Sequence, residues 1–382
     1  MFWRILIAIT LDAVMNRLLV LSKKACLTLL ACGFITLAAP VLAATPLITP
    51  EHKHYQYTGR IDFTQADAPL LSWPGSSIKA NFSGSYLAIV LNDQRGKNFY
   101  NVIIDGDNTS PYVLEAKQGE HTYVISTALA DAPHTLEIYK RTEGEEGWTQ
   151  FKGLRLADNA SLLPPHARLK RRMEIYGDSI TSGMGNEGAD NGADHLSSEK
   201  NNYLAYGAFA ARELNAELHT ISQSGIGVMI SWFDFIMPQF YDQVNAVGNN
   251  DSRWDFSQWT PDVVVINLMQ NDSWLIDREK RLQPIPSDDE RVAHYQNFVS
   301  TIRSKYPQAQ IICALGSMDA TNTEKWPNYV RQAVANLQAK GDSKIDSLFF
   351  EFNGYGQHPR VAQHKANGHK LAQFIKQKMA WH

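Results

Sequence analysis

The stretch 263–268 constrains the fold of this chain more than any other part of its sequence. It reads Val-Val-Val-Ile-Asn-Leu, a nearly continuous apolar run with four β-branched residues in a row. Such a run is typical of a strand that is buried on both faces, and strands of this kind occur in parallel sheets covered by helices. The rest of the chain must therefore supply neighbouring strands and the helices that cover them.

The segments around that run alternate between strand-like and helix-like patterns. Further strands are predicted at 173–176, 217–222, 310–315 and 348–352. Helices are predicted between them at 203–214, 291–305, 328–340 and 360–379. This order predicts a three-layer α/β domain with a parallel sheet over residues 173–382. Ligands of such domains lie at the carboxyl ends of the strands, so the residues just after each strand are candidate site residues.

The preceding part of the chain has a different pattern. Short strand-like runs, separated by turn signals such as Asn-Asp and Asp-Gly, occur at 85–91, 99–104, 121–125 and 134–139. Short strands at this spacing predict an all-β sandwich over residues 45–156. Residues 157–172 are polar and contain two consecutive prolines, which predicts a linker between the two domains.

Residues 1–44 predict a secretory signal peptide. A long apolar run, 25–44, follows Lys23 and Lys24 and ends in small residues. We expect cleavage after Ala43 or Ala44, which would give a secreted or periplasmic protein with no stable membrane insertion. An uncleaved membrane anchor is one alternative, because the apolar run is near spanning length. A lipoprotein that begins at Cys32 is a weaker one, because apolar residues continue well past Cys32.

The charge and the cysteines narrow the function further. Loss of residues 1–44 would change the formal net charge from −3 to about −6. A mildly acidic body argues against a nucleic-acid partner and suits a neutral ligand. Cys313 would then be the one cysteine left, within an apolar run, so we expect a buried core residue and no intramolecular disulfide.

Four short segments that follow predicted strands carry chemistry-bearing residues. Gly177-Asp178-Ser179 offers a serine nucleophile, and Ser224-Gly225 offers a backbone N–H that an oxyanion can approach closely. Gln270-Asn271-Asp272 offers the side-chain amide of Asn271 as another donor. His358-Pro359 offers a histidine base at the start of the last helix. Each segment alone is also ordinary turn chemistry.

We predict no metal site and no cofactor. His364 and His369 follow His358 in the sequence, but their spacing of five residues does not place them on one helical face. The chain contains no other convincing cluster of metal-ligating residues.

The order of the four segments resembles the characteristic blocks of SGNH hydrolases. That resemblance implies Ser179 as nucleophile, His358 as base, and an oxyanion hole formed by the backbone of Ser179 and Gly225 and the side chain of Asn271. It covers residues 173–382.

The first half of the chain resembles the jelly-roll-like sandwich domain of carbohydrate esterase family 2. The resemblance rests on the segments 100–106, 134–143 and 151–154. Members of that family are exported acetyl esterases that act on xylan and glucomannan. The resemblance thus implies an exported serine esterase that removes acetyl groups from plant cell-wall polysaccharide, with acetylated polysaccharide or oligosaccharide as its partner.

The sequence departs from the SGNH pattern in two ways. Met269 stands where the superfamily usually has glycine, and we expect its side chain to narrow the acyl pocket. The catalytic aspartate usually lies two or three residues before the histidine, but Tyr355 and Gly356 occupy those positions. We therefore expect a Ser-His dyad in which a backbone carbonyl orients the imidazole, and no catalytic role for Glu351, the nearest upstream carboxylate.

Substrate contacts and rival functions are less sharply defined by the sequence. Trp274 is a candidate for stacking on a sugar ring, and Asn202 and Tyr203 are candidates to line the site. Four other tryptophans compete with Trp274 for the stacking role: Trp232, Trp254, Trp259 and Trp326. A lipase-like or general carboxylesterase and a non-catalytic carbohydrate-binding protein are the rival functions. We expect a monomer.

Overall fold

The computed structural model describes residues 45–354 and 356–381, and the predicted signal peptide lies outside the described residues. The chain from Thr45 onward forms one compact unit. Within the described residues, no helix combines the length and apolar character needed to cross a bilayer.

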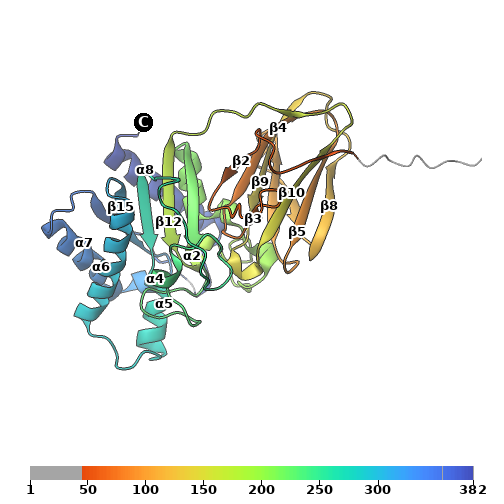
Figure 1. The fold of residues 1–382 in the computed structure, drawn as a ribbon. Coiled ribbons are helices and arrows are strands. Elements are labelled where there is room, and N and C mark those ends of the chain that lie inside the picture. The colour runs from red at the N-terminus through yellow and green to blue at the C-terminus, as the bar shows by residue number, and fades with distance from the viewer. Residues whose placement is uncertain (1–44, 355, 382) are drawn as a thin grey trace, which may run out of the picture. The chain divides into compact units, whose positions relative to one another are not determined.

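The first part of this unit is a sandwich of two antiparallel sheets (Figure 1). Apolar side chains from both sheets, among them Ile78, Ile89, Leu91 and Ile138, fill the space between them. The first sheet consists of β1 (Leu47–Ile48), β3 (Leu70–Leu71), β5 (Leu87–Asp93), β8 (Gly119–Ser126) and β10 (Thr149–Leu156). The second consists of β2 (Gln56–Thr58), β4 (Ser77–Ser83), β6 (Phe99–Ile104), β7 (Tyr112–Glu115), β9 (Pro133–Lys140) and β11 (Leu162–Leu163).

The second part is a parallel sheet with the strand order β13-β12-β14-β15-β16. Its strands are β12 (Arg171–Gly177), β13 (Ala216–Ser222), β14 (Val263–Asn267), β15 (Gln310–Leu315) and β16 (Ile345–Phe349). Along β14, Val263 and Val265 belong to one buried cluster, and Val264 and Ile266 belong to another. Burial on both faces explains why the sequence of this strand is apolar almost throughout.

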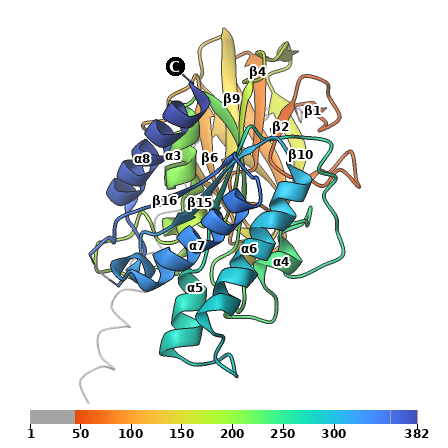
Figure 2. The same cartoon turned by 90° about the vertical axis from the view of Figure 1, so that its left-hand side faces the viewer.

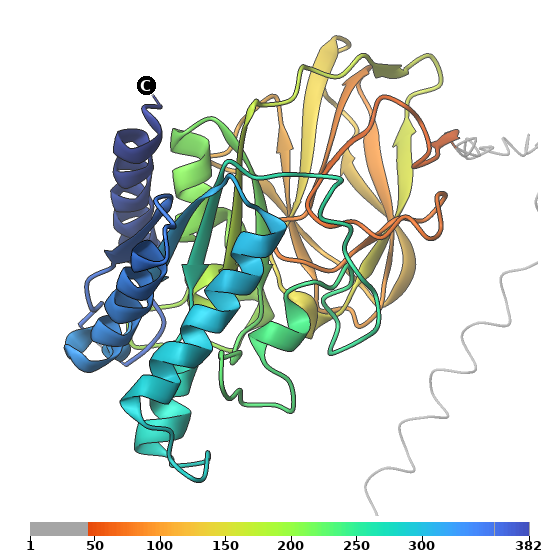
Figure 3. The ribbon, with the colours of Figure 1, turned by 60° about the vertical axis from the view of Figure 1, so that its left-hand side comes forward.

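Four longer helices cover the two faces of the parallel sheet. Helices α3 (Tyr206–Glu213) and α8 (Val361–Met379) pack together on one face (Figure 2). Helices α6 (Asp288–Lys305) and α7 (Lys325–Ala339) pack together on the other (Figure 3). The shorter helical turns are η1 (Gly144–Glu146), α2 (Ser179–Ser182), η2 (Ser197–Glu199), η3 (Asn202–Leu204), α4 (Met237–Phe240), α5 (Gln270–Asp272), η4 (Ser273–Arg278) and η5 (Asp319–Asn322).

The predicted fold class, a sandwich followed by a three-layer α/β domain, is confirmed. Several bounds differ by a few residues, and three differences concern the elements themselves or the last strand. The last strand ends at Phe349 rather than 352, the predicted helix 203–214 is divided into η3 and α3, and part of the predicted linker 157–172 is strand. In that segment β11 pairs with β4 and β12 begins at Arg171, so tertiary pairing overrides its loop-like composition.

A buried ion pair joins the two parts of the chain. Arg60, between β2 and β3, places Nη2 3.2 Å from Oε1 of Glu174 on β12, and both side chains are fully buried. Burial alone would raise the pKa of Glu174, but the charge of Arg60, the nearby His219 and a hydrogen bond from Tyr176 outweigh it and bring the pKa to about 2. The carboxylate is therefore ionised and depends on its cationic partner.

The replacement Arg60→Met should lower the free energy of unfolding by about 3–5 kcal/mol, because it leaves a buried carboxylate without its cation. Urea denaturation of both proteins measures the difference. Lys79→Met is the matched control, since it breaks an exposed ion pair with Glu137 and should change stability far less. Equal free energies of unfolding for Arg60→Met and Lys79→Met would contradict the conclusion that the buried carboxylate of Glu174 depends on Arg60.

Candidate active site

Ser179 lies at the carboxyl end of β12, where the chain turns into α2. Gly177 ends the strand, and a Cβ at this position would lie 1.9 Å from Oγ1 of Thr181, so only glycine fits. Asp178 caps α2 by accepting a hydrogen bond of 3.0 Å from the N–H of Ile180. Burial and the nearby Asp272 raise the pKa of Asp178 to about 7. These contacts hold Ser179 as the first residue of the helical turn.

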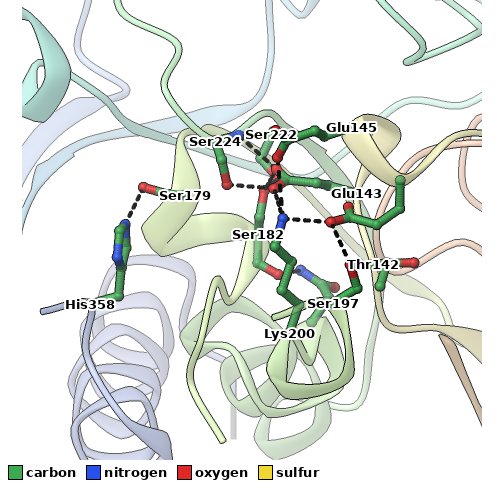
Figure 4. A network of polar contacts seen from close by, with 12 residues as sticks. Thr142, Glu143, Glu145, Ser179, Ser182, Ser197, Lys200, Ser222, Ser224 and His358 are labelled. Carbon is green, nitrogen blue, oxygen red and sulfur yellow. Dashed lines mark hydrogen bonds and ion pairs between the residues drawn. The ribbon is translucent and has the colours of Figure 1, made fainter. Parts of the chain in front are cut away.

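The structure brings Ser179 and His358 together. Nε2 of His358 lies 2.7 Å from Oγ of Ser179 (Figure 4). On the other side of the ring, Nδ1 lies 2.8 Å from Oδ2 of Asp194. A carboxylate only accepts, so Nδ1 carries the proton and Nε2 is free to accept the proton of the serine hydroxyl.

The expected Ser-His dyad with a backbone carbonyl is therefore wrong. Asp194 supplies the carboxylate, and it lies in the loop between α2 and η2, far ahead of the histidine in the sequence. Glu351, as expected, has no part in this contact. Its side chain is 93% exposed, and its carboxylate lies 3.8 Å from Lys370.

Arg360 holds Asp194 in place. Its Nη1 donates to Oδ1 of Asp194 over 2.6 Å, and the same guanidinium donates to the carbonyl groups of Gly185, Ala189 and Gly192. Partial burial would raise the pKa of Asp194, but hydrogen bonds from His358 and Arg360 outweigh it and bring the pKa to about 2. The Asp194 carboxylate is thus ionised at neutral pH.

Two backbone N–H groups beside Ser179 are free to bind an oxyanion. Neither the N–H of Ser179 nor that of Gly225 donates to another described residue. Gly225 has φ +84°, and a Cβ there would lie 3.3 Å from Trp232 and Phe233. Glycine therefore permits both the left-handed backbone and the close packing at this turn.

Asn271 follows β14 and reaches the same pocket. Its Oδ1 accepts a hydrogen bond of 3.0 Å from Nε1 of Trp232, and its Nδ2 donates to the carbonyl of Ile226 over 2.9 Å. Because an indole N–H can only donate, Trp232 fixes the orientation of the amide. The second hydrogen of Nδ2 is left with only a 3.5 Å contact to Asp178.

Met269 does not narrow the pocket, contrary to expectation. Its side chain is completely buried in the core beneath the sheet edge, although its backbone has the left-handed φ of +88°. That backbone conformation favours glycine, which explains the usual residue at this position.

Ser179, Gly225, Asn271 and His358 line one pocket of about 570 Å³. The aromatic residues of its wall are Trp232, Phe233, Phe235 and the predicted Trp274, and the sandwich contributes Arg95, Gly144 and Glu145. The side chain of Trp232 is the more open of the two indoles, at 41% exposure for the residue.

Asn202 and Tyr203 are not part of this pocket, so their predicted substrate contacts are wrong. Asn202 is buried between the two parts of the chain, where it accepts from the Tyr139 hydroxyl and donates to the carbonyl of Thr181. Tyr203 packs edge-to-face on Tyr139. The other candidate tryptophans lie elsewhere: Trp254 beneath Arg60, Trp259 stacked on His219, and Trp326 in the core.

Comparison with known proteins gives two family matches. Residues 57–165 match the model described as carbohydrate esterase 2 N-terminal, and residues 175–368 match that of the GDSL-like lipase/acylhydrolase family. A structure of a family two carbohydrate esterase from Clostridium thermocellum in complex with cellohexaose is 31% identical, with a TM-score of 0.77. The match covers 86% of this chain and 100% of that one.

Two curated relatives are similar over most of this chain. A cellulase/esterase, CelE, of Acetivibrio thermocellus is 33% identical over 85% of this chain, which spans 39% of that relative's length. An acetylxylan esterase/glucomannan deacetylase of Cellvibrio japonicus is 25% identical over 89% of this chain and 93% of its own length.

The replacement Asp194→Asn should lower kcat roughly 10³- to 10⁴-fold, because an amide at this position favours the wrong tautomer of His358. Steady-state kinetics with a simple acetyl ester measure the loss. Glu351→Gln serves as the control and should retain activity. Near-normal turnover of Asp194→Asn would show that a group other than Asp194 orients His358.

The replacement Asn271→Ala should lower kcat about 10²-fold, since loss of one oxyanion donor typically costs about 3 kcal/mol in the transition state. Thermal unfolding of the variant, recorded beside the wild type, checks that the fold is intact. A folded variant with unchanged turnover would remove Asn271 from the oxyanion hole.

Proposed function

This chain belongs to carbohydrate esterase family 2, and from that membership we propose that it removes O-acetyl groups from plant cell-wall polysaccharide. The observation that carries the proposal is the hydrogen-bonded series Ser179, His358 and Asp194, of which Ser179 and His358 line the pocket. A nucleophile, a base and an orienting carboxylate, hydrogen-bonded in this order, form an arrangement that is suited to acyl transfer.

The first half of the reaction acetylates the serine. His358 Nε2 accepts the proton of Ser179 as Oγ attacks the acetyl carbonyl. Asp194 stabilises the imidazolium that forms and keeps Nε2 directed at the serine. The bond between the carbonyl carbon and the sugar oxygen then breaks, and His358 gives the proton to the leaving sugar hydroxyl.

The second half releases acetate. Water attacks the acetyl-serine while His358 Nε2 removes its proton. The bond between the carbonyl carbon and Oγ of Ser179 then breaks, and His358 returns the proton to Oγ. In both halves the negative charge develops on the former carbonyl oxygen. The N–H groups of Ser179 and Gly225 and the amide of Asn271 stabilise this oxygen, because they are positioned before the reaction begins.

The substrate follows from the family and from the pocket wall. The Cellvibrio japonicus relative is named an acetylxylan esterase/glucomannan deacetylase, and the Clostridium thermocellum structure is a complex with cellohexaose. Trp232 and Trp274 present indole rings beside Ser179 here. Such rings suit the apolar faces of sugars, so the pocket accepts an acetylated polysaccharide or oligosaccharide.

An exported monomer is consistent with this function. Polysaccharide of the plant cell wall lies outside the cell, and the N-terminal sequence 1–44 has the order of a signal peptide. Ser179, His358 and Asp194 all come from one chain, so the reaction needs no second copy.

The proposed function is tested by measuring acetate released from acetylated xylan, acetylated glucomannan and a long-chain fatty-acid ester. We expect release from at least one polysaccharide, slow cleavage of the long-chain ester, and no turnover by Ser179→Ala. Faster cleavage of the long-chain ester would identify a lipase-like enzyme instead. Glycan binding without acetate release would identify a carbohydrate-binding protein.

A further inference from the structure

A buried carboxylate from the sandwich lies next to the candidate active site. Glu143 precedes the helical turn η1, and its side chain is completely buried. Gly144 and Glu145, which follow it, line the pocket with Ser179 and His358. Figure 4 shows Glu143 in a polar network beside Ser179 and His358.

Glu143 makes contacts with two different elements of the α/β part. Its Oε2 accepts hydrogen bonds from the backbone N–H of Ser224 over 2.6 Å and from Oγ of Ser182 over 2.7 Å. Its Oε1 accepts a hydrogen bond of 2.5 Å from Oγ of Ser224. One carboxylate therefore binds both the backbone and the side chain of Ser224, together with the end of α2.

These two elements carry the backbone donors of the oxyanion hole. Ser179 begins α2, the helix that ends at Ser182, and Gly225 directly follows Ser224. The position of each N–H relative to the other depends on how α2 and the turn at 224–225 are held. Glu143 is bonded to both, and so links the two donors from behind the pocket.

We propose that Glu143 is a positioning residue that holds the N–H groups of Ser179 and Gly225 at the spacing needed to bind the oxyanion. This proposal rests on the esterase function proposed above. The carboxylate touches neither substrate nor the reacting atoms and acts through Ser182 and Ser224. The sandwich then takes part in catalysis as well as in folding.

The charge of Lys200 keeps the Glu143 carboxylate ionised, so that it can accept hydrogen bonds. Nζ of Lys200 lies 3.3 Å from Oε1 of Glu143, 3.2 Å from Oε2 of Glu145 and 2.6 Å from Oε1 of Glu146. Burial would raise the pKa of Glu143, but Lys200 and the bonds from Ser224 and Ser182 outweigh it and hold the pKa below its ordinary value. The lysine occupies the centre of these three carboxylates, where a metal ion would otherwise be a candidate.

The test compares Glu143→Gln with Glu146→Gln, using 4-nitrophenyl acetate as substrate. Glutamine keeps the shape of Glu143, but it replaces one accepting oxygen with an amide that cannot accept from Ser224. We expect kcat to fall about 10- to 100-fold with KM nearly unchanged, because misplaced donors weaken binding of the transition state and not of the ester.

Glu146→Gln is the matched control. It removes a carboxylate from the same turn and the same lysine, but Glu146 contacts neither Ser182 nor Ser224. Its kcat should stay within about twofold of the wild type by the reasoning that only transition-state contacts change kcat. Equal kcat values for the two variants, or a change confined to KM, would overturn the proposal.

Ser224→Ala covers the case in which Glu143→Gln does not fold. This variant keeps the ion pair between Glu143 and Lys200 and removes only the 2.5 Å bond to the turn. We expect a several-fold loss of kcat at constant KM, and an unchanged kcat would overturn the proposal. A wild-type protein that hydrolyses no ester would instead refute the esterase function itself.

Discussion

The carboxyl edge of the parallel sheet determines where the chemistry of this chain can occur. Strands β13, β12 and β14 are neighbours, so the residues that follow them emerge side by side. Neighbouring strands lie about 4.8 Å apart, so the residues that follow them, Gly225, Ser179 and Asn271, lie close to one another. His358 follows β16, two strands beyond β14, and the segment after that strand has to carry it back to Ser179.

This geometry explains how much of the site could be predicted from the sequence. The four strand ends were visible because buried parallel strands are apolar runs with a recognisable length, and Ser179, Gly225, Asn271 and His358 each follow one. Asp194 and Glu143 follow no strand of the parallel sheet. Asp194 and Glu143 are held in place by contacts with Arg360 and Lys200, which are distant in the sequence. The spacing of residues along the sequence does not reveal such contacts. The predicted substrate contacts of Asn202 and Tyr203 are wrong for the same reason, because both residues are buried by contacts with the sandwich.

The position of Asp194 shows which property matters in a carboxylate that orients a histidine base. The imidazole needs an ionised acceptor at Nδ1, held firmly enough to set the tautomer, and the chain segment that provides it is free to vary. Here a loop that precedes the histidine by more than 160 residues provides the carboxylate. Arg360, two residues after His358, binds both Asp194 and the backbone of that loop. Arg360 thus holds Asp194 in position for its hydrogen bond with His358.

Among the buried charges that the sandwich contributes to the α/β part, two differ in what their burial can contribute. Arg60 meets Glu174 in a fully buried pair, and Glu143 meets Lys200 beside the pocket. Buried ion pairs add little net stability, because desolvation offsets most of their attraction, so stability alone is a weak reason for them. A fixed carboxylate does, however, orient the groups that donate to it. At Glu143 those groups are Ser182 and Ser224, which makes geometry at the oxyanion hole the stronger reason for a buried charge there.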